Sequence, residues 1–281
     1  MNATPIPEDA PDGTGALSSL PNWFTQREVI PLDDHLALVV CHEIMHGIVS
    51  ICRAIADEPS PVLLTGETGV GKSLLCRFMH ASRNPYAPYV SRMTAGLGAE
   101  VLETRIFGAG GDAQAEAMVE EASGGTLVFE EMGDLPMAIQ TKLLSYWDRQ
   151  ASGEIAGGPV QWICTTNLPL KALDASKSML PEFMARFRRV HVPPLRERKQ
   201  DIPALVAYFS RLKSSKEASL QSLEILAKRL SRHTFPGNVR ELESIVSLEA
   251  GEGAWEWRVD GSNKSFRLGA KGMKKSGSAK R

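Results

Sequence analysis

The sequence predicts an α/β fold in which helices sandwich a parallel β-sheet, followed by a small helical domain. Two observations predict it. Short apolar strand patterns alternate with helical patterns between residues 62 and 192, as in parallel sheets that are covered on both faces. From Asp201 onward the strand patterns stop, and three helical patterns follow, at residues 202–212, 220–232 and 239–248.

The elements of the sheet domain are predicted from the spacing of apolar residues. A leading helix is expected over 34–56, because six apolar residues recur there at spacings of three or four: Leu36, Val40, Ile44, Ile48, Ile51 and Ile55. Strands are expected at 62–64, 89–90, 126–129, 160–165 and 190–192. Helices are expected at 74–81, 99–106, 113–122 and 139–148.

These patterns divide the chain into four segments. Residues 1–25 are rich in Pro, Gly, Asp and Ser without a period and predict a flexible leader. An α/β domain is expected over 26–200 and a small helical domain over 201–250. Residues 251–281 combine a hairpin-like alternation with a basic tail, which is either a solvated terminus or a segment that contacts phosphate.

Composition excludes several classes of function. The net charge of −1 gives no general attraction to nucleic acid or to an anionic membrane. The four cysteines form no CxxC pair and lie in apolar stretches, which favours buried thiols over disulfides or a zinc site. Neither a membrane-spanning apolar run nor a signal pattern is found, so the sequence predicts a cytoplasmic protein without membrane contact.

One segment matches the phosphate-binding pattern G-x-x-x-x-G-K-[ST] in full: Gly66, Glu67, Thr68, Gly69, Val70, Gly71, Lys72 and Ser73. A buried strand precedes it and a helix follows. Glycines let backbone N–H groups turn toward phosphates, and the helix N-terminus adds its positive dipole. Lys72 is expected to reach the β- and γ-phosphates of ATP, and the Ser73 hydroxyl to ligate Mg²⁺. The alternative is a glycine-rich turn without a ligand.

Glu130 and Glu131 end the apolar strand predicted at 126–129. In the same sheet as the phosphate loop, this position delivers one carboxylate to Mg²⁺ and the other to the attacking water. The spacing does not decide which of the two acids takes which role. The alternative is that both acids are solvated at the start of a loop.

Three further side chains are candidates for contact with the terminal phosphate. Asn167 ends the next strand, where an amide can orient water, although Asn also serves turns. Arg186 and Arg240 lie near the two ends of the helical region, and either could stabilise charge on the transferring phosphoryl group. Spacing alone favours the alternative that both are surface arginines.

The segment His42–His46 matches H-E-x-x-H, a zinc-protease pattern. Both histidines are expected on the helix face opposite the apolar stripe, and no third ligand follows at the spacing such sites use. We therefore interpret the match as incidental.

The chain resembles the central AAA+ domain of the sigma-54-dependent transcriptional activators (bacterial enhancer-binding proteins) from Val39 to Leu248. The resemblance rests on seven blocks in family order: Val62–Lys72, Gly124–Leu127, Gly133–Pro136, Gln140–Leu144, Thr165–Asn167, Pro193–Ile202 and Phe235–Glu243. It implies that Glu131 polarises water and that Asn167 is the first sensor. Arg186 aligns with the second of two arginine fingers that reach a neighbouring subunit, and Arg240 with the second sensor. A hexamer-like ring is therefore implied.

The sequence departs from the family at several positions. The GAFTGA loop that contacts sigma-54 is absent from the interval between Phe107 and Gly124. Glu130 stands at the Mg²⁺ position, where the family usually has an aspartate. Leu180 stands where the family has its first arginine finger. No helix-turn-helix pattern follows Leu248 and no receiver pattern precedes residue 34, so direct DNA binding is not expected.

Two hypotheses of function follow. The first is a ring-forming ATPase that regulates transcription or remodels a protein partner, such as RNA polymerase or another transcription protein, without standard sigma-54 activation. The second is a degenerate ATP-binding module that switches assembly or partner binding with little hydrolysis. A sigma-54 activator with a cryptic contact loop is a third reading.

Overall fold

The computed structural model describes residues 27–33, 36–108, 117–155, 157–213, 220–250, 256–258 and 267–269. Its centre is a five-stranded sheet in which every neighbouring pair is parallel. The strand order is β4 (Tyr89–Met93), β5 (Thr126–Glu130), β6 (Gln161–Thr166), β3 (Val62–Thr65) and β7 (Arg188–His191). The predicted fold class is confirmed.

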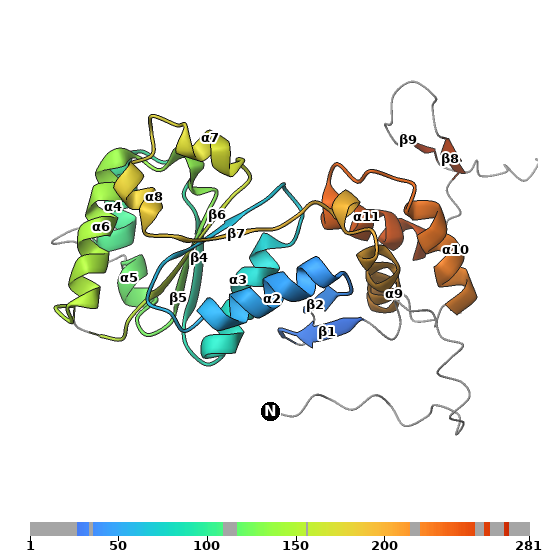
Figure 1. Ribbon diagram of the computed structural model, residues 1–281, viewed down its shortest axis with the longest axis horizontal. Helices are drawn as coiled ribbons and strands as arrows, with labels where there is room; N and C mark the ends of the chain where they lie inside the picture. The colour runs from blue at the N-terminus through green and yellow to red at the C-terminus, as the bar shows by residue number, and fades with distance from the viewer. Residues whose placement is uncertain are drawn as a thin grey trace, which may run out of the picture.

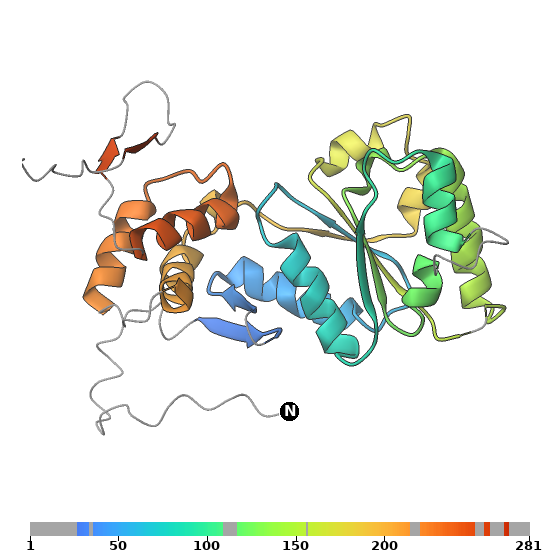
Figure 2. The same cartoon turned by 180° about the vertical axis from the view of Figure 1, so that it is seen from behind.

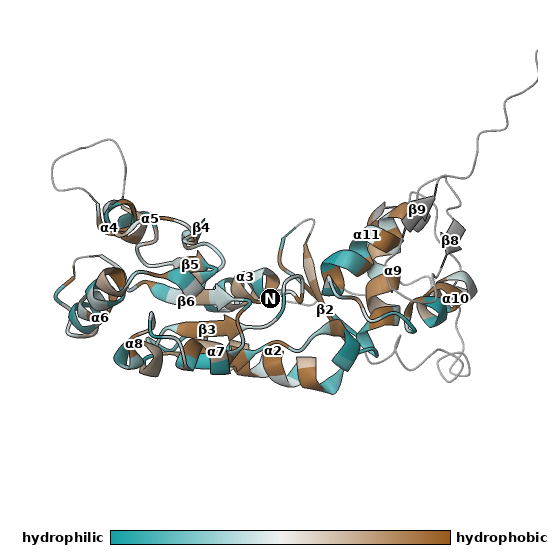
Figure 3. Cartoon of the chain, turned by 90° about the horizontal axis from the view of Figure 1, so that it is seen from above, coloured by the Kyte–Doolittle hydropathy of each residue, from teal (hydrophilic) through white to brown (hydrophobic). Residues whose placement is uncertain are grey.

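Helices cover both faces of this sheet (Figure 3). One face carries α2 (Glu43–Ile55) and α3 (Lys72–Arg83), and the other carries α4 (Ala99–Phe107), α5 (Met118–Glu121), α6 (Met137–Ala151) and α8 (Pro181–Ala185). Successive side chains of a strand point to opposite faces. Val62 and Leu64 accordingly join the core under α2 and α3, whereas Leu63 joins the core under α4 and α6.

Short elements connect these layers at the carboxyl ends of the strands. The 3₁₀ helix η2 (Met132–Asp134) follows β5, and α7 (Leu170–Asp174) follows β6. A second 3₁₀ helix, η3 (Leu195–Glu197), follows β7 and leads to the lid.

Three helices form the lid, which lies beside the sheet (Figure 1): α9 (Asp201–Lys213), α10 (Leu220–Leu230) and α11 (Asn238–Ala250). The hairpin of β1 (Glu28–Pro31) and β2 (Ala37–Val40) joins the two parts. Leu38 and Val40 enter the core under α2, while Val39 and Cys41 enter the lid core. Near the C-terminus, β8 (Glu256–Arg258) pairs with β9 (Arg267–Gly269) in antiparallel fashion, as the hairpin-like alternation predicts.

The predicted helix over 34–56 is wrong in its first part. Residues 37–40 form a strand, and α2 begins only at Glu43, where the His42 ring Nδ1 accepts the Ile44 N–H at 3.1 Å. Ile44 and Ile51 are 48% and 51% exposed, so they do not belong to the buried face. That face consists instead of Met45, Ile48, Val49 and Cys52.

Other boundaries also differ from the prediction. The helix expected over 113–122 is described only from Met118 to Glu121, and residues 109–116 lie outside the described part of the chain. Strand β7 runs over Arg188–His191 rather than 190–192, although the Val192 N–H still donates to the Thr65 carbonyl at 2.8 Å. The leader over 1–25 and the basic tail beyond residue 269 lie outside the described residues.

Candidate nucleotide-binding site

The phosphate-loop residues 66–71 connect β3 to α3 at the carboxyl edge of the sheet. Three of its glycines have backbone conformations that L side chains rarely adopt: φ is +149° at Gly66, +79° at Gly69 and +108° at Gly71. This explains why the pattern requires glycine at positions 66 and 71. The loop thus has the curved backbone of an anion-binding nest in front of a helix N-terminus.

Lys72 is the first residue of α3, and its side chain is buried. Its ammonium group donates to the carbonyl oxygens of Gly66 at 2.7 Å and Glu67 at 3.2 Å. Burial lowers the pKa of Lys72, and the negative charge of nearby Glu131 opposes this shift. Ser73 is exposed in the same first helical turn, so its hydroxyl is accessible to a ligand.

The two acids at the end of β5 have different environments. Glu131 has a left-handed backbone with φ of +56°, which is uncommon outside glycine and typical of functional sites. Its Oε2 accepts the backbone N–H of Asn167 at 3.1 Å. Glu130 is turned toward β4, where its Oε1 accepts the Ser91 hydroxyl at 2.7 Å. Of the two acids, Glu131 has the larger effect on Lys72.

The structure brings Asn167 and Arg240 to the phosphate loop but not Arg186. Asn167 follows β6 next to Glu131, and its side chain is exposed. Arg240 lies on α11 beside the loop, since a Cβ atom on Gly69 would stand 3.2 Å from the Arg240 Cβ. Arg186 directly follows α8 and lies near the amino ends of the strands, where its Nη2 pairs with Asp148 Oδ1 at 2.7 Å.

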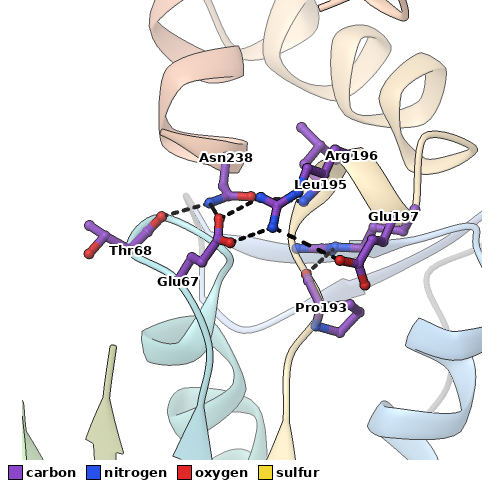
Figure 4. Close-up of polar contacts among 8 residues, drawn as sticks. Glu67, Thr68, Pro193, Leu195, Arg196, Glu197 and Asn238 are labelled. Carbon is purple, nitrogen blue, oxygen red and sulfur yellow. Dashed lines mark hydrogen bonds and ion pairs between the residues drawn. The ribbon is translucent and has the colours of Figure 1, made fainter. Parts of the chain in front are cut away.

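The side chain of Glu67 faces the lid rather than the interior of the loop (Figure 4). Both of its oxygens accept from the guanidinium of Arg196, at 2.6 and 2.8 Å, and Asn238 Nδ2 donates to Oε2 at 3.1 Å. These donors, with Arg196 the largest cause, lower the pKa of Glu67 to about 2.

Sequence reasoning gave no role to several residues that shape this site. Three of them lie in sequence blocks shared with the family: Arg196, Arg198 and Asn238. Membership of these blocks is the one sequence feature that could have indicated a role for them. Ser91 lies in no such block, and only its neighbourhood in the sheet reveals its contact with Glu130.

The H-E-x-x-H match does not form a metal site. His42 caps α2, and His46 Nδ1 lies 3.4 Å from Glu28 Oε2. The described residues contain no group of three or more His, Cys, Asp or Glu that could hold a metal ion. All four cysteines are free and buried, as expected. In the described ranges, no helix combines the length and the apolar character that crossing a membrane requires.

Comparison with known proteins agrees with this geometry. The profile of the family described as Sigma-54 interaction domain matches residues 38–192, and that of the AAA+ ATPase lid domain matches residues 196–249. The chain belongs to the sigma-54 interaction domain family. The first match ends one residue after β7, the last strand of the five-stranded sheet. The second match covers the lid helices α9, α10 and α11 up to residue 249.

Relatives of this sigma-54 interaction domain are transcriptional regulators. It is 30% identical over 271 residues to the DNA-binding transcriptional regulator NtrC of Bradyrhizobium sp. (strain RP501 Parasponia), an alignment that covers 84% of this chain and 56% of NtrC. It is 35% identical over 221 residues to the Nif-specific regulatory protein of Sinorhizobium fredii (strain NBRC 101917 / NGR234), covering 73% and 37% of the two chains. The chain therefore spans only part of the length of these relatives.

Solved structures support the fold. NtrX from Brucella abortus in complex with ADP aligns with a TM-score of 0.63 and 25% identity over 81% of this chain and 52% of NtrX. The ATP complex of the same protein gives a TM-score of 0.58 and 27% identity over 74% and 51%. Both align with about half of the NtrX chain.

Proposed function

We propose that this sigma-54 interaction domain binds ATP with Mg²⁺ and hydrolyses the nucleotide. The observation that carries the proposal is the meeting of two elements at the carboxyl edge of the sheet. The loop Gly66–Ser73 presents a buried lysine there, and the carboxylate of Glu131 lies within electrostatic reach of it. The ADP and ATP complexes of NtrX, which has the same fold, support nucleotide binding.

Each residue of the site has a role in this proposal. Lys72 neutralises the β- and γ-phosphates, and the hydroxyl of Ser73 and the carboxylate of Glu130 would hold Mg²⁺. The metal supplies positive charge to the phosphate oxygens when it is bound. Glu131 orients the attacking water, and the Asn167 N–H holds its carboxylate in place.

The placement of Arg186 supports assembly into a ring. This arginine lies far from the phosphate loop of its own chain, so it would act on the site of a neighbour in a hexamer-like ring. Such a ring would use ATP to regulate transcription or remodel a protein partner, such as RNA polymerase or another transcription protein. Because the GAFTGA hexapeptide is absent, we propose that it does so without standard sigma-54 activation.

A second candidate function is an ATP-dependent switch with little hydrolysis. It is favoured by the hydrogen bond that holds Glu130 Oε1 on the Ser91 hydroxyl, because that bond directs the carboxylate toward β4. Leu180 at the position of the family's first arginine finger favours it as well.

Phosphate release separates the two candidates. An ATPase requires the wild type to release phosphate at least about a hundredfold faster than Glu131→Gln, as expected when a general base is lost. Equal background rates in both proteins, with ATP still bound, would assign the switch function instead. Binding is measured with a fluorescent ATP analogue, and Lys72→Ala serves as the variant expected to lose it. A wild type that fails to bind the analogue would overturn both candidates.

A further inference from the structure

All the carbonyl oxygens of the phosphate loop from residue 66 to residue 70 accept hydrogen bonds. Those of Gly66 and Glu67 accept from the Lys72 ammonium, at 2.7 and 3.2 Å. The next three accept from the lid and the segment that leads to it: Thr68 from Asn238 Nδ2 at 3.0 Å, Gly69 from the Val239 N–H at 3.0 Å, and Val70 from Arg198 Nη2 at 2.5 Å.

These bonds also determine where the N–H groups of the loop point. In a trans peptide the carbonyl and the N–H of the following residue point in opposite directions, and the described residues contain no cis peptide. Because the carbonyls of Thr68, Gly69 and Val70 face the lid, the N–H groups of the following residues 69–71 face away from it. Backbone N–H groups of this kind bind phosphate in such loops.

Asn238 is held firmly in the position from which it donates to the Thr68 carbonyl. It is fully buried at the start of α11, and its φ of +54° suits only a few residue types, Asn and Gly among them. Its amide is used on both sides: Nδ2 donates to Glu67 and Thr68, and Oδ1 accepts the Leu195 N–H at 2.8 Å. The residue therefore joins the loop, η3 and α11 at one point.

Arg198 is anchored in the same way. Its side chain is only 3% exposed, and its guanidinium pairs with the fully buried Asp201 at 3.2 Å. Asp201 in turn accepts the N–H groups of Cys41 and His42, at 2.9 and 2.6 Å. The donor that holds the Val70 carbonyl is thus fixed by the lid and by the strand β2 that joins it to the sheet.

We propose that Asn238 and Arg198 are positioning residues for the phosphate-binding peptides, and that the Glu67–Arg196 pair anchors Asn238 against the loop. This assignment rests on the proposed ATP site. It makes the affinity for polyphosphate depend on the position of the lid: a lid that moves away releases three loop carbonyls, and the N–H groups behind them lose their common direction.

The first test is Asn238→Gly, which keeps the backbone conformation accessible and removes both amide donors. We expect the affinity for ATP to fall about tenfold or more, the size typical of lost hydrogen bonds that orient charged ligands. The affinity for AMP, whose single phosphate depends least on the loop, should change less than about twofold. Both are measured by competition with a fluorescent ATP analogue. The exposed ion pair Arg149–Glu154 supplies the control Arg149→Gln, which should bind both nucleotides as the wild type does.

The second test breaks the anchoring pair Glu67–Arg196. It does so by removing the carboxylate: Glu67→Ala should weaken ATP binding, because Asn238 Nδ2 loses its acceptor at 3.1 Å and Arg196 loses both of its contacts. In the Asn238→Gly background the same substitution should change the ATP affinity by less than about twofold, since a residue that acts through Asn238 has no further effect once that amide is gone. Circular dichroism melting checks that each variant is folded.

The outcomes separate this inference from the function on which it rests. A wild type that binds no ATP overturns the proposed function itself. A wild type that binds ATP, together with variants that lose ATP and AMP affinity equally or lose neither, overturns the positioning role alone. A Glu67→Ala substitution that lowers the ATP affinity equally with and without the Asn238 amide overturns the anchoring role of Glu67.

Discussion

At the scale of single residues, Gly69 packs directly against the lid. A Cβ atom there would stand 2.3 Å from the Gly237 carbonyl oxygen, and φ is +79°. We expect Gly69→Ala to lower the free energy of unfolding by about 1–3 kcal/mol, the usual cost of a strained backbone position. Urea denaturation measures this. Gly47→Ala is the matched control, because nothing lies within 4 Å of its added Cβ, and in helix α2 it should stabilise by about 0.5–1 kcal/mol. Similar effects of the two substitutions would contradict the steric argument.

The carboxyl group of Glu67 predicts a dependence on pH. Its pKa in the folded protein lies near 2, below the ordinary value of 4.5, so folding favours the ionised form. The stability that Glu67 contributes over Glu67→Gln should be fully present above about pH 4.5 and should shrink as the pH falls toward 2. The effect is small because the side chain is 41% exposed and therefore screened by solvent. Denaturant titrations of both proteins at several pH values measure the difference. A difference that grows on acidification would be the opposite result.

The local part of this site is predictable from the sequence, and the distant part is not. The spacing of glycines before Lys72 specifies the turn of the loop, because the backbone angles are a local property. The partners of Glu67 lie 129 and 171 residues away in the chain, at Arg196 and Asn238. No periodicity or composition relates positions so far apart, so the lid contacts become visible only in the structure.

At the scale of elements, Gln140 connects α6 to the segment before α8. The side chain is fully buried; its Nε2 donates to the carbonyls of Leu135 and Ser178, both at 2.7 Å, and its Oε1 accepts the Leu180 N–H at 2.8 Å. Gln140→Leu would leave these backbone groups without their partner. We expect a loss of about 1–3 kcal/mol in the free energy of unfolding, the cost of unsatisfied buried polar groups.

Urea denaturation of Gln140→Leu tests this prediction beside a control on the same helix. Ser145 is exposed, so Ser145→Ala should change stability by less than about 0.5 kcal/mol. If both variants unfold at the wild-type denaturant concentration, the amide does not join these elements energetically.

The element that the sequence failed to predict shows the limit of periodicity. Leu36, Val40 and Ile44 have helical spacing, yet residues 37–40 pair as a strand with β1. Alternate residues of this strand enter two different cores, and apolar residues on both sides of a strand imitate a helical stripe. Asp201 also fixes the strand end by accepting two N–H groups, a contact across 160 residues that no local pattern contains.

At the scale of the whole molecule, the phosphate loop lies at the carboxyl ends of the strands of the sheet, and Arg186 lies near their amino ends. The loop follows Thr65 at the end of β3, whereas Arg188, two residues beyond Arg186, pairs with Val62 at its beginning. Four strand residues separate the two ends by about 13 Å. Figures 1 and 2 show α8 and the lid toward opposite ends of the molecule. Arg186 therefore lies away from the phosphate loop of its own chain, and its proposed role as an arginine finger would require a neighbouring copy.

This separation predicts complementation between two inactive variants. Lys72→Ala lacks a nucleotide site but keeps Arg186, and Arg186→Ala keeps the site but lacks the finger. In a ring with head-to-tail contacts, an equal mixture forms complete sites wherever an Arg186→Ala subunit meets the finger of a Lys72→Ala subunit, which is about one contact in four. We expect each variant alone to release phosphate at background rates and the mixture to reach about a quarter of the wild-type rate. A mixture as inactive as its components, or an Arg186→Ala variant as active as the wild type, would show that the finger does not act between subunits.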